Sequence, residues 1–322
     1  MITAEKYRDT VARPERPLIA VVIPVYCEAA SIRSNLAVID KSLQIIDGIN
    51  YAFLLVDDGS TDQSWEEIQS IAAADSRVRA LRFSRNFGKE AAIAAGLEHA
   101  EGDAVIVMDA DLQHPPHLIP EMVRLWREEA FDIVDAVKQD RGKETMLYRL
   151  SVALFTAALC SVSGFDMRGS SDFKLLDRNV VTAWLAMKER VTFYRAMTEW
   201  LGFRHMQLPM SVAPRAAGMS RWNLARLVRL ATTAMTAFST SALHLTTALG
   251  ALFVLSAFLF GLYTLGQWLR GYSLEGFATV ILLQLIIGGC IMVALGIVGE
   301  YIATIFQEVK RRPRYIIRDQ TE

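Results

Sequence analysis

The sequence predicts an α/β domain on a doubly wound, largely parallel β-sheet, followed by a two-helix transmembrane hairpin. Three observations lead to this fold class. Short β-branched runs alternate with helical segments, carboxylates follow several of these runs, and two long uncharged apolar runs lie in the last quarter of the 322 residues. This alternation is typical of sheets covered on both faces by helices, in which ligands bind beyond the carboxyl ends of the strands.

The order of the expected elements supports this class. The expected strands, each a short apolar run, are Leu18–Val25, Tyr51–Val56, Val78–Phe83, Ala104–Met108 and Ile133–Val137. The expected helices run from Ser31 as N-cap to about Ile45, from Thr61 or Asp62 onward, over the Ala-rich Lys89–Ala100, and over about 121–129 after three prolines. The β-α alternation therefore predicts a parallel sheet over residues 18–220, the expected catalytic domain.

Composition limits the class of protein. Hydrophobic residues make up 52% of the chain, which is high for a purely soluble enzyme, and the formal net charge is −1. This balance gives no reason to expect a nucleic-acid partner. The cysteines, Cys27, Cys160 and Cys290, are far apart and odd in number, so neither a disulfide framework nor a zinc site is indicated. Residues 1–17 lack the apolar core of a signal peptide, and we expect a flexible N-terminus.

Two apolar segments allow two interpretations each. The segment Tyr148–Val162 is too short to span a bilayer, so it is either a core helix or a helix in the membrane interface. The segment Asn223–Leu230 places Arg226 and Arg229 against apolar residues. This pattern favours an interfacial amphipathic helix over 221–241, with an ordinary surface helix as the alternative.

The two long apolar runs predict a hairpin over residues 242–301. The spans, at about 242–265 and 277–298, carry no charge, and each can cross about 30 Å of hydrocarbon. Basic residues precede the first span and follow the second, in the tail 302–322. Because basic flanks stay in the cytoplasm, we expect a multi-pass inner-membrane protein with both ends and the catalytic domain on the cytoplasmic side. The alternative is a buried helical pair in a soluble protein.

Two carboxylates follow the expected fourth strand. Asp109 and Asp111 form an Asp-x-Asp pair, which can hold a hard divalent cation such as Mg²⁺ or Mn²⁺. Such a cation would neutralise the diphosphate of a bound nucleotide. The pair alone is weak evidence, because solvated turns often contain it. The apolar strand before it and the Leu-Gln-His-Pro-Pro segment after it make the prediction stronger.

Two further clusters close the strands before it. Asp57 and Asp58 begin an Asp-Asp-Gly-Ser turn, whose carboxylates can accept hydrogen bonds from a base or a ribose. A turn with a helix cap is the alternative, and for this motif alone it is the better one. Tyr26 and Glu28 end the first strand with an aromatic ring and a carboxylate. Together the clusters predict one binding rim at the carboxyl edge of the sheet.

The ordered motifs resemble a known family. The segments IPVYCE, DDGSTD and DADLQHPP look like the nucleotide-sugar-binding half of glycosyltransferase family 2. The rest of the chain is similar to its polyprenyl-phosphate branch, which includes dolichol-phosphate mannose synthase and the bactoprenol glucosyltransferases. The supporting segments are RNFGKEAA (85–92), SDFKLLDR (171–178), ERVTFYRAMTEWLGF (189–203), PRAAGMSRW (214–222) and VGEYIATIFQEVKRRPRY (298–315).

The resemblance implies a GT-A (Rossmann-like) fold and an inverting transfer of a hexose from a nucleotide-sugar to polyprenyl phosphate. Asp109 and Asp111 would hold the metal, and the implied catalytic residues are Asp111 and Asp172. Asp172 would act beside the acceptor phosphate or the sugar, as an orienting group or a base, unless it is a structural carboxylate. The implied donor contacts are Pro24, Tyr26, Glu28, Asp57, Asp58, Asp109, Gln113 and Lys138. The implied phosphate and acceptor contacts, for which plain surface charge is the alternative, are Arg141, Arg195, Arg215, Ser220 and Arg221.

Three residues depart from the family pattern. Cys27 stands in place of the usual Asn, Lys138 where Arg is common, and Met219 where Glu is frequent. These changes put in doubt a contact near the base, a bidentate clamp and the acceptor loop, respectively. None of them touches the Asp-x-Asp pair.

The donor sugar stays open. UDP-glucose is the first choice, because the Asp-Phe-Lys-Leu and Trp-Leu-Gly-Phe segments look most like bactoprenol glucosyltransferases; the product would then serve cell-envelope glycan modification. GDP-mannose, UDP-N-acetylhexosamine and UDP-aminoarabinose are alternatives. A processive polysaccharide synthase would need more spans, and a non-catalytic membrane scaffold would not need its carboxylates intact. The sequence leaves open whether the protein forms a homo-oligomer.

Overall fold

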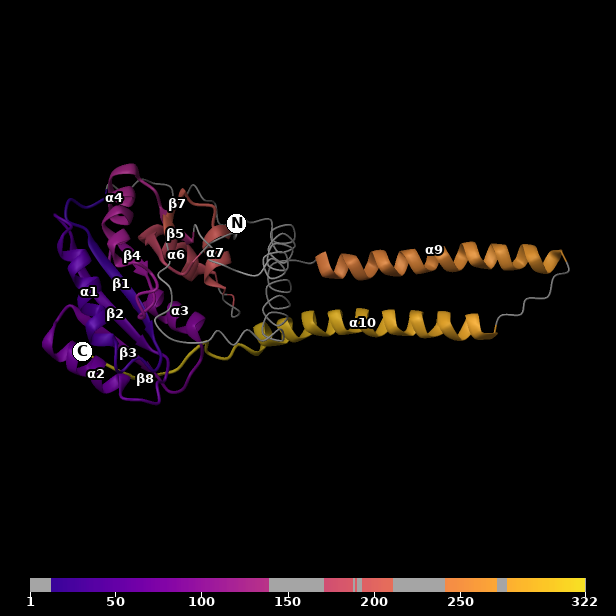
Figure 1. Cartoon of the computed structure of the whole chain (residues 1–322), viewed down its shortest axis with the longest axis horizontal. Helices are drawn as coiled ribbons and strands as arrows, with labels where there is room; N and C mark the ends of the chain where they lie inside the picture. The colour runs from indigo at the N-terminus through magenta and orange to yellow at the C-terminus, as the bar shows by residue number, and fades with distance from the viewer. Residues whose placement is uncertain are drawn as a thin grey trace. The chain divides into compact units, whose positions relative to one another are not determined.

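A computed structural model of the chain describes residues 13–138, 171–187, 189, 193–210, 241–270 and 277–321. These residues fall into two compact units, labelled by element in Figure 1. The described part of the α/β unit covers 13–210 with the gaps just given, and it includes 312–321 from the C-terminus. The helical unit contains the two long helices near the C-terminus.

One half of the central sheet is parallel. The sheet has eight strands in the order β7-β5-β6-β4-β1-β2-β3-β8 (Figure 1). The strands of this half are β1 (Leu18–Val25), β2 (Asn50–Asp57), β3 (Val78–Phe83) and β4 (Ala104–Val107). β1 pairs in parallel with β2 and β4, and β2 pairs in parallel with β3. The sequence predicts each of these strands, and their carboxyl ends meet at one edge of the sheet.

Helices bury the central strand β1 on both faces. The helices around this half are α1 (Ile32–Gln44), α2 (Ser64–Ala74), α3 (Lys89–His99) and α4 (Ile119–Glu129), with the short η2 (Pro116–Leu118) before α4. Ile19, Val21 and Ile23 belong to one core with buried residues of α1, α2 and α4. On the other face α3 approaches so closely that a Cβ on Gly96 would lie 2.1 Å from a methyl carbon of Val22. Because side chains alternate along a strand, this double burial accounts for the uninterrupted apolar run of β1.

The other half of the sheet is mixed. Its elements are β5 (Ile133–Lys138), β6 (Lys174–Asp177), α6 (Arg178–Ala186), α7 (Tyr194–Trp200) and β7 (His205–Met210). β6 runs antiparallel to both β4 and β5, and β5 pairs in parallel with β7. The sequence predicts β5 but not β6 or β7. β6 is short and bounded by charges, and β7 contains Pro209, which demotes a strand in sequence-based prediction.

Both ends of the α/β unit are more ordered than the sequence predicts. The expected tail 302–322 contains β8 (Ile317–Gln320), which pairs antiparallel with β3 and covers that edge of the sheet. The ring of Tyr315 stacks on Phe83 with 5.0 Å between centroids. Arg13 falls in the expected flexible N-terminus, yet its guanidinium donates to the carbonyl of Phe131 at 3.0 Å and lies over the ring of Trp126. These contacts join chain ends to core aromatics, which local sequence patterns do not reveal.

The helical unit consists of α9 (Ser241–Leu269) and α10 (Phe277–Lys310), which contact each other (Figure 1). Within them, Thr246–Gln267 and Ile286–Lys310 have mean hydropathies of 2.1 and 2.0 and are long and apolar enough to cross a membrane. Neither segment is buried within the protein. Both helices run beyond the expected spans. The segments 148–162 and 223–230 lie outside the described residues.

Candidate active site

A pocket of about 390 Å³ is lined by residues that follow β1, β2 and β4 and by the loop before α3. We call it the strand-end pocket. The predicted site residues that line it are Pro24, Tyr26, Glu28, Asp58, Asp109 and Asp111. The pocket is also lined by Asn86, Gly88 and Lys89. The structure thus brings together three carboxylate clusters that are far apart in the sequence.

The Asp-Asp-Gly-Ser turn and the start of α2 hold the backbone that follows β1. The hydroxyl of Ser60 accepts a hydrogen bond from the Cys27 N–H at 2.9 Å, and that of Ser64 accepts one from the Glu28 N–H at 2.8 Å. Cys27 has a φ of +56°, an uncommon value for a non-glycine residue. The two hydroxyls hold this backbone in place and so position Tyr26 and Glu28. At position 27, where Cys replaces the usual Asn of the family, the residue is therefore held through its backbone N–H.

Asp57 stabilises this turn through hydrogen bonds and does not line the pocket. Its carboxylate is fully buried and accepts from the N–H of Ser60 at 3.1 Å, and the Arg82 guanidinium lies 3.4 Å away. Burial raises the pKa of Asp57, while the Ser60 and Arg82 contacts oppose the shift. Gly59 makes the turn possible, because it has a φ of +69° and its Cβ would lie 2.4 Å from the Arg85 carbonyl carbon. In this structure Asp57 thus holds the turn, and its predicted nucleotide contact stays a prediction.

Asp58 lines the pocket and also fixes the loop before α3. Its two carboxylate oxygens accept from the N–H of Phe87 at 2.7 Å and the N–H of Gly88 at 2.9 Å. Burial raises the pKa of Asp58, and these hydrogen bonds oppose the shift. One carboxylate therefore links the turn after β2 to the start of α3, where Lys89 begins the helix.

The Asp-x-Asp pair is organised by His114. The Asp109 N–H donates to Nδ1 of His114 at 3.0 Å, and the imidazole stacks on Phe173 with 5.3 Å between centroids. Burial lowers the pKa of His114, so the ring is neutral at pH 7 and carries its proton on Nε2. Asp111 is exposed and accepts from the Gln113 N–H at 3.0 Å. The pair presents only carboxylate oxygens, the ligands that suit Mg²⁺ or Mn²⁺.

A chain of alternating charges leads away from this pair. Nζ of Lys89 lies 2.6 Å from an oxygen of Asp109 and 2.6 Å from an oxygen of Asp172. Arg195 then donates to Asp172 through Nε at 2.7 Å and through a terminal nitrogen at 3.1 Å. We call these four residues the ion chain. Burial alone would raise the pKa of Asp172, but Arg195 and Lys89 hold it well below its usual range, so this carboxylate is ionised.

Sequence reasoning missed Lys89, although a signal for it exists. It is the first residue of α3, and a lysine there opposes the helix dipole, so a lysine in the Gly-Lys-Glu segment needs another explanation. Arg195, a predicted phosphate contact, lies in the ion chain, and its contact with a phosphate stays a prediction. Lys138 is the last residue of β5, and Gln113 does not line the strand-end pocket. Arg141, Arg215, Ser220 and Arg221 lie outside the described residues.

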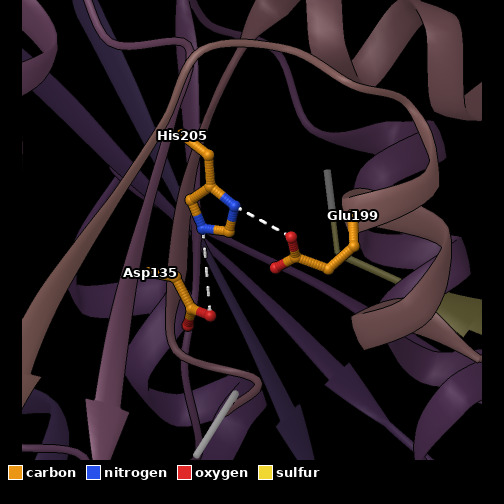
Figure 2. A group of neighbouring side chains, drawn as sticks. All are labelled: Asp135, Glu199 and His205. Atoms are coloured by element: carbon orange, nitrogen blue, oxygen red, sulfur yellow. Dashed lines mark hydrogen bonds and ion pairs between the residues drawn. The ribbon is translucent and has the colours of Figure 1, made fainter. Parts of the chain in front are cut away.

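A second group of ionisable side chains lies between β5, α7 and β7. Asp135, Glu199 and His205 place their ligand atoms within 4.8 Å of one another, which is close enough to hold a metal ion (Figure 2). Lys174 already supplies a cation there, because its fully buried Nζ lies 2.9 Å from Asp135 and 3.4 Å from Glu199. Nδ1 of His205 lies 3.0 Å from Glu199. We call this group the buried ion network.

Comparisons with known proteins agree with this architecture. The model of glycosyl transferase family 2 matches residues 20–183. The chain is 35% identical over 303 residues to the SfII prophage-derived bactoprenol glucosyl transferase of Shigella flexneri, covering 93% of this chain and 97% of that protein. It is 34% identical over 303 residues to an uncharacterized glycosyltransferase of Bacillus subtilis, covering 93% of each.

The chain is also similar to solved structures. Glucosyl-3-phosphoglycerate synthase from Mycobacterium tuberculosis has a TM-score of 0.46 and 23% identity, covering 68% of this chain and 76% of that one. A mannosyltransferase from Pyrobaculum calidifontis has a TM-score of 0.45 and 17% identity, covering 96% and 93%.

The family match falls on the part of the chain that carries the strand-end pocket. It begins in β1 and ends in α6, so it includes the three carboxylate clusters and Asp172. The mixed sheet and this match confirm the predicted GT-A fold. The relatives are similar over nearly the whole chain, both long helices included. The chain is therefore a glycosyltransferase and belongs to glycosyltransferase family 2.

Proposed function

We propose that the protein transfers a hexose from a nucleotide-sugar to polyprenyl phosphate with inversion at the anomeric carbon. UDP-glucose is the proposed donor. The observation that carries the proposal is the strand-end pocket, which contains Asp109 and Asp111 and in which the ion chain begins. Relatives named bactoprenol glucosyl transferases, similar over nearly their full length, support a lipid acceptor and a glucosyl donor.

The donor is proposed to bind in the strand-end pocket. The ring of Tyr26 is 47% exposed and offers a face or edge to the base. Glu28 accepts from the hydroxyl of Ser31 at 2.6 Å, which orients its carboxylate, and Asp58 keeps lone pairs for a ribose hydroxyl. Asp109 and Asp111 would hold Mg²⁺ or Mn²⁺, and their carboxylate oxygens at the pocket, together with the ion pair of Asp109 with Lys89, support this proposal. When bound, the metal neutralises charge on the leaving diphosphate.

The acceptor phosphate is proposed to meet the far end of the ion chain. Two nitrogens of Arg195 donate hydrogen bonds to Asp172, so its guanidinium has further N–H groups that can bind a phosphate oxygen. A phosphate monoester has a second pKa of about 6, so the nucleophile is mostly ionised at neutral pH without a strong base. Its oxygen forms a bond to the sugar C1 as the bond from C1 to the nucleotide diphosphate breaks. Asp172 serves by holding Arg195 in position.

The two long helices are proposed to place this chemistry at the membrane. Their apolar side chains face outward, as with Val254 at 72% and Met292 at 69% exposed, which suits a lipid environment. Basic residues after α10, at positions 311, 312 and 314, favour the cytoplasmic side for that end. Reporter tags should then be accessible only from the cytoplasm at both termini, and only from outside near Tyr272. Termini on opposite sides would contradict the hairpin.

A donor panel tests the proposal. The purified full chain is incubated with polyprenyl phosphate, Mg²⁺ or Mn²⁺, and UDP-glucose, UDP-N-acetylglucosamine or GDP-mannose in turn, and lipid-linked sugar is measured. We expect product with UDP-glucose, none in excess chelator, and recovery when metal is restored. Product with another donor alone would correct the sugar. No product with any donor, or full activity in chelator, would overturn the reaction or its metal, respectively.

A further inference from the structure

We propose that Lys89 is an exchangeable counter-ion. In the empty enzyme its ammonium joins Asp109 to Asp172, and on loading it moves to the diphosphate of the donor as a divalent cation takes its place at Asp109. Donor loading thereby removes one of the two cations that hold Asp172. The inference rests on the proposed function, because it takes the strand-end pocket as the donor site.

Lys89 is shared between two parts of the site. It lines the strand-end pocket, whereas Asp172 does not. Its Nζ nevertheless lies 2.6 Å from both Asp109 and Asp172. The side chain of Lys89 is 41% exposed and that of Asp109 26%, while that of Asp172 is only 6% exposed. The ammonium therefore sits at the boundary between open pocket and buried carboxylate, where a bound ligand can reach it.

The contact with Asp109 is one that a metal would disturb. A divalent cation on Asp109 and Asp111 would share a carboxylate with the ammonium, and like charges at such distances repel strongly. The donor brings a diphosphate to the same pocket and thus offers the ammonium a new partner. A lysine head is a point charge on a flexible stem, so it can change partners without a fixed geometry.

The backbone next to Lys89 is anchored, whereas its side chain is long and has several rotatable bonds. Gly88 and Phe87, just before it, donate their N–H groups to Asp58, which also lines the pocket. Arg195 differs, because two hydrogen bonds hold its planar fork on Asp172. When Lys89 turns toward the diphosphate, Asp172 keeps Arg195 and loses its other cation. In the loaded enzyme the carboxylate is then paired with Arg195 alone, next to the proposed acceptor phosphate site.

Metal and nucleotide binding to the purified full chain in detergent test the exchange. Free Mn²⁺ is measured by electron paramagnetic resonance without nucleotide, and UDP and GDP binding is measured in saturating Mn²⁺. For Lys89→Met we expect Mn²⁺ alone to bind at least about threefold tighter and the nucleoside diphosphate about tenfold weaker. Lys89→Arg should bind Mn²⁺ more weakly than wild type, because a guanidinium binds a carboxylate more firmly than an ammonium does and would be harder for the metal to displace from Asp109. Lys41→Met, on the exposed surface of α1, is the matched control and should change neither.

The opposite changes expected in Lys89→Met, tighter Mn²⁺ binding and weaker nucleotide binding, distinguish the exchange from other roles of Lys89. A structural role would weaken both kinds of binding in Lys89→Met, and a simple phosphate contact would leave Mn²⁺ binding unchanged. Either result in a variant with wild-type thermal stability would overturn the exchange. If wild-type protein binds Mn²⁺ but neither UDP nor GDP, the proposed donor site fails and the exchange fails with it. If wild-type protein binds both and the opposite shifts are missing, only the exchange fails.

Discussion

The two halves of the sheet satisfy their carboxylates in different ways. In the parallel half, Asp58 and Asp111 accept hydrogen bonds from backbone N–H groups a short distance along the chain or in the next loop. In the mixed half, Asp135 is paired with the buried Lys174, and Asp172 with Arg195. Neutral donors orient a carboxylate without cancelling its charge, whereas cationic partners do both. In the parallel half Lys89 offsets the charge of Asp109, but Asp58 and Asp111 are held by neutral N–H groups, so negative charge remains there that attracts a cation. The mixed half is largely neutralised by its own side chains.

The first prediction concerns the cation that neutralises the buried carboxylates of the mixed half. Lys174→Met removes the cation of the buried ion network and leaves Asp135 and Glu199 without it. Removing one partner of a buried pair costs about 3–5 kcal/mol, so the free energy of unfolding of the α/β unit should fall by that amount. Chemical denaturation in detergent measures it, with the exposed Lys41→Met as control. A loss as small as that of the control would show that the network is not needed for stability.

The second prediction concerns Glu90, which joins the two halves. It lies on α3, accepts from the Tyr194 N–H at 2.8 Å, and burial raises its pKa to about 7. Because the folded state holds the proton more tightly than the unfolded state, stability is fully present below about pH 4.5 and declines until the pH passes 7. From the shift we expect a decline of about 3 kcal/mol, absent in Glu90→Gln.

Thermal melting between pH 4.5 and 8 checks this pH dependence. The stability of Glu90→Gln relative to wild type should rise with pH across that window. Equal pH profiles for the two proteins would mean that the fold does not raise the pKa of Glu90.

The third prediction separates the two cation sites. Asp109→Asn should lower turnover at least about 100-fold, or roughly 2.7 kcal/mol of barrier, because the donor site loses a ligand for the metal. His205→Ala alters the other group that could hold a metal, and we expect its Mn²⁺ requirement to match that of wild type. Initial rates against Mn²⁺ concentration decide the point. A metal requirement that changes in His205→Ala but not in Asp109→Asn would reverse the assignment.

The same contrast explains what could be predicted from the sequence. The parallel half follows local rules: apolar strands end at turn residues, and these turns carry the carboxylates. Asp109, Asp111 and Asp58 were therefore placed at one edge, where the strand-end pocket lies. Asp57 does not line this pocket, and alternation along a strand does not tell which of two adjacent carboxylates points into the turn.

The ion chain could not be predicted in the same way. Lys89 and Asp172 are 83 positions apart in the chain, and Asp135 and Lys174 are 39 apart. Such pairs depend on the antiparallel insertion of β6 between β4 and β5, a topology that no local signal in the sequence specifies. The covering of β3 by β8 is another pairing of this kind, because β8 follows the second long helix.

The last prediction concerns Asp172, at which the two halves meet. Asp172→Asn keeps the shape of the side chain but leaves Lys89 and Arg195 without their shared anion. We expect turnover to fall at least about tenfold, or roughly 1.4 kcal/mol of barrier, with Mn²⁺ binding retained. Since the pKa of Asp172 is held well below its usual range, the carboxylate is a poor proton acceptor, and the loss should persist above pH 8. Rates from pH 6 to 9 test this: rescue at high pH would identify Asp172 as a base, and persistence supports a positioning role through Arg195.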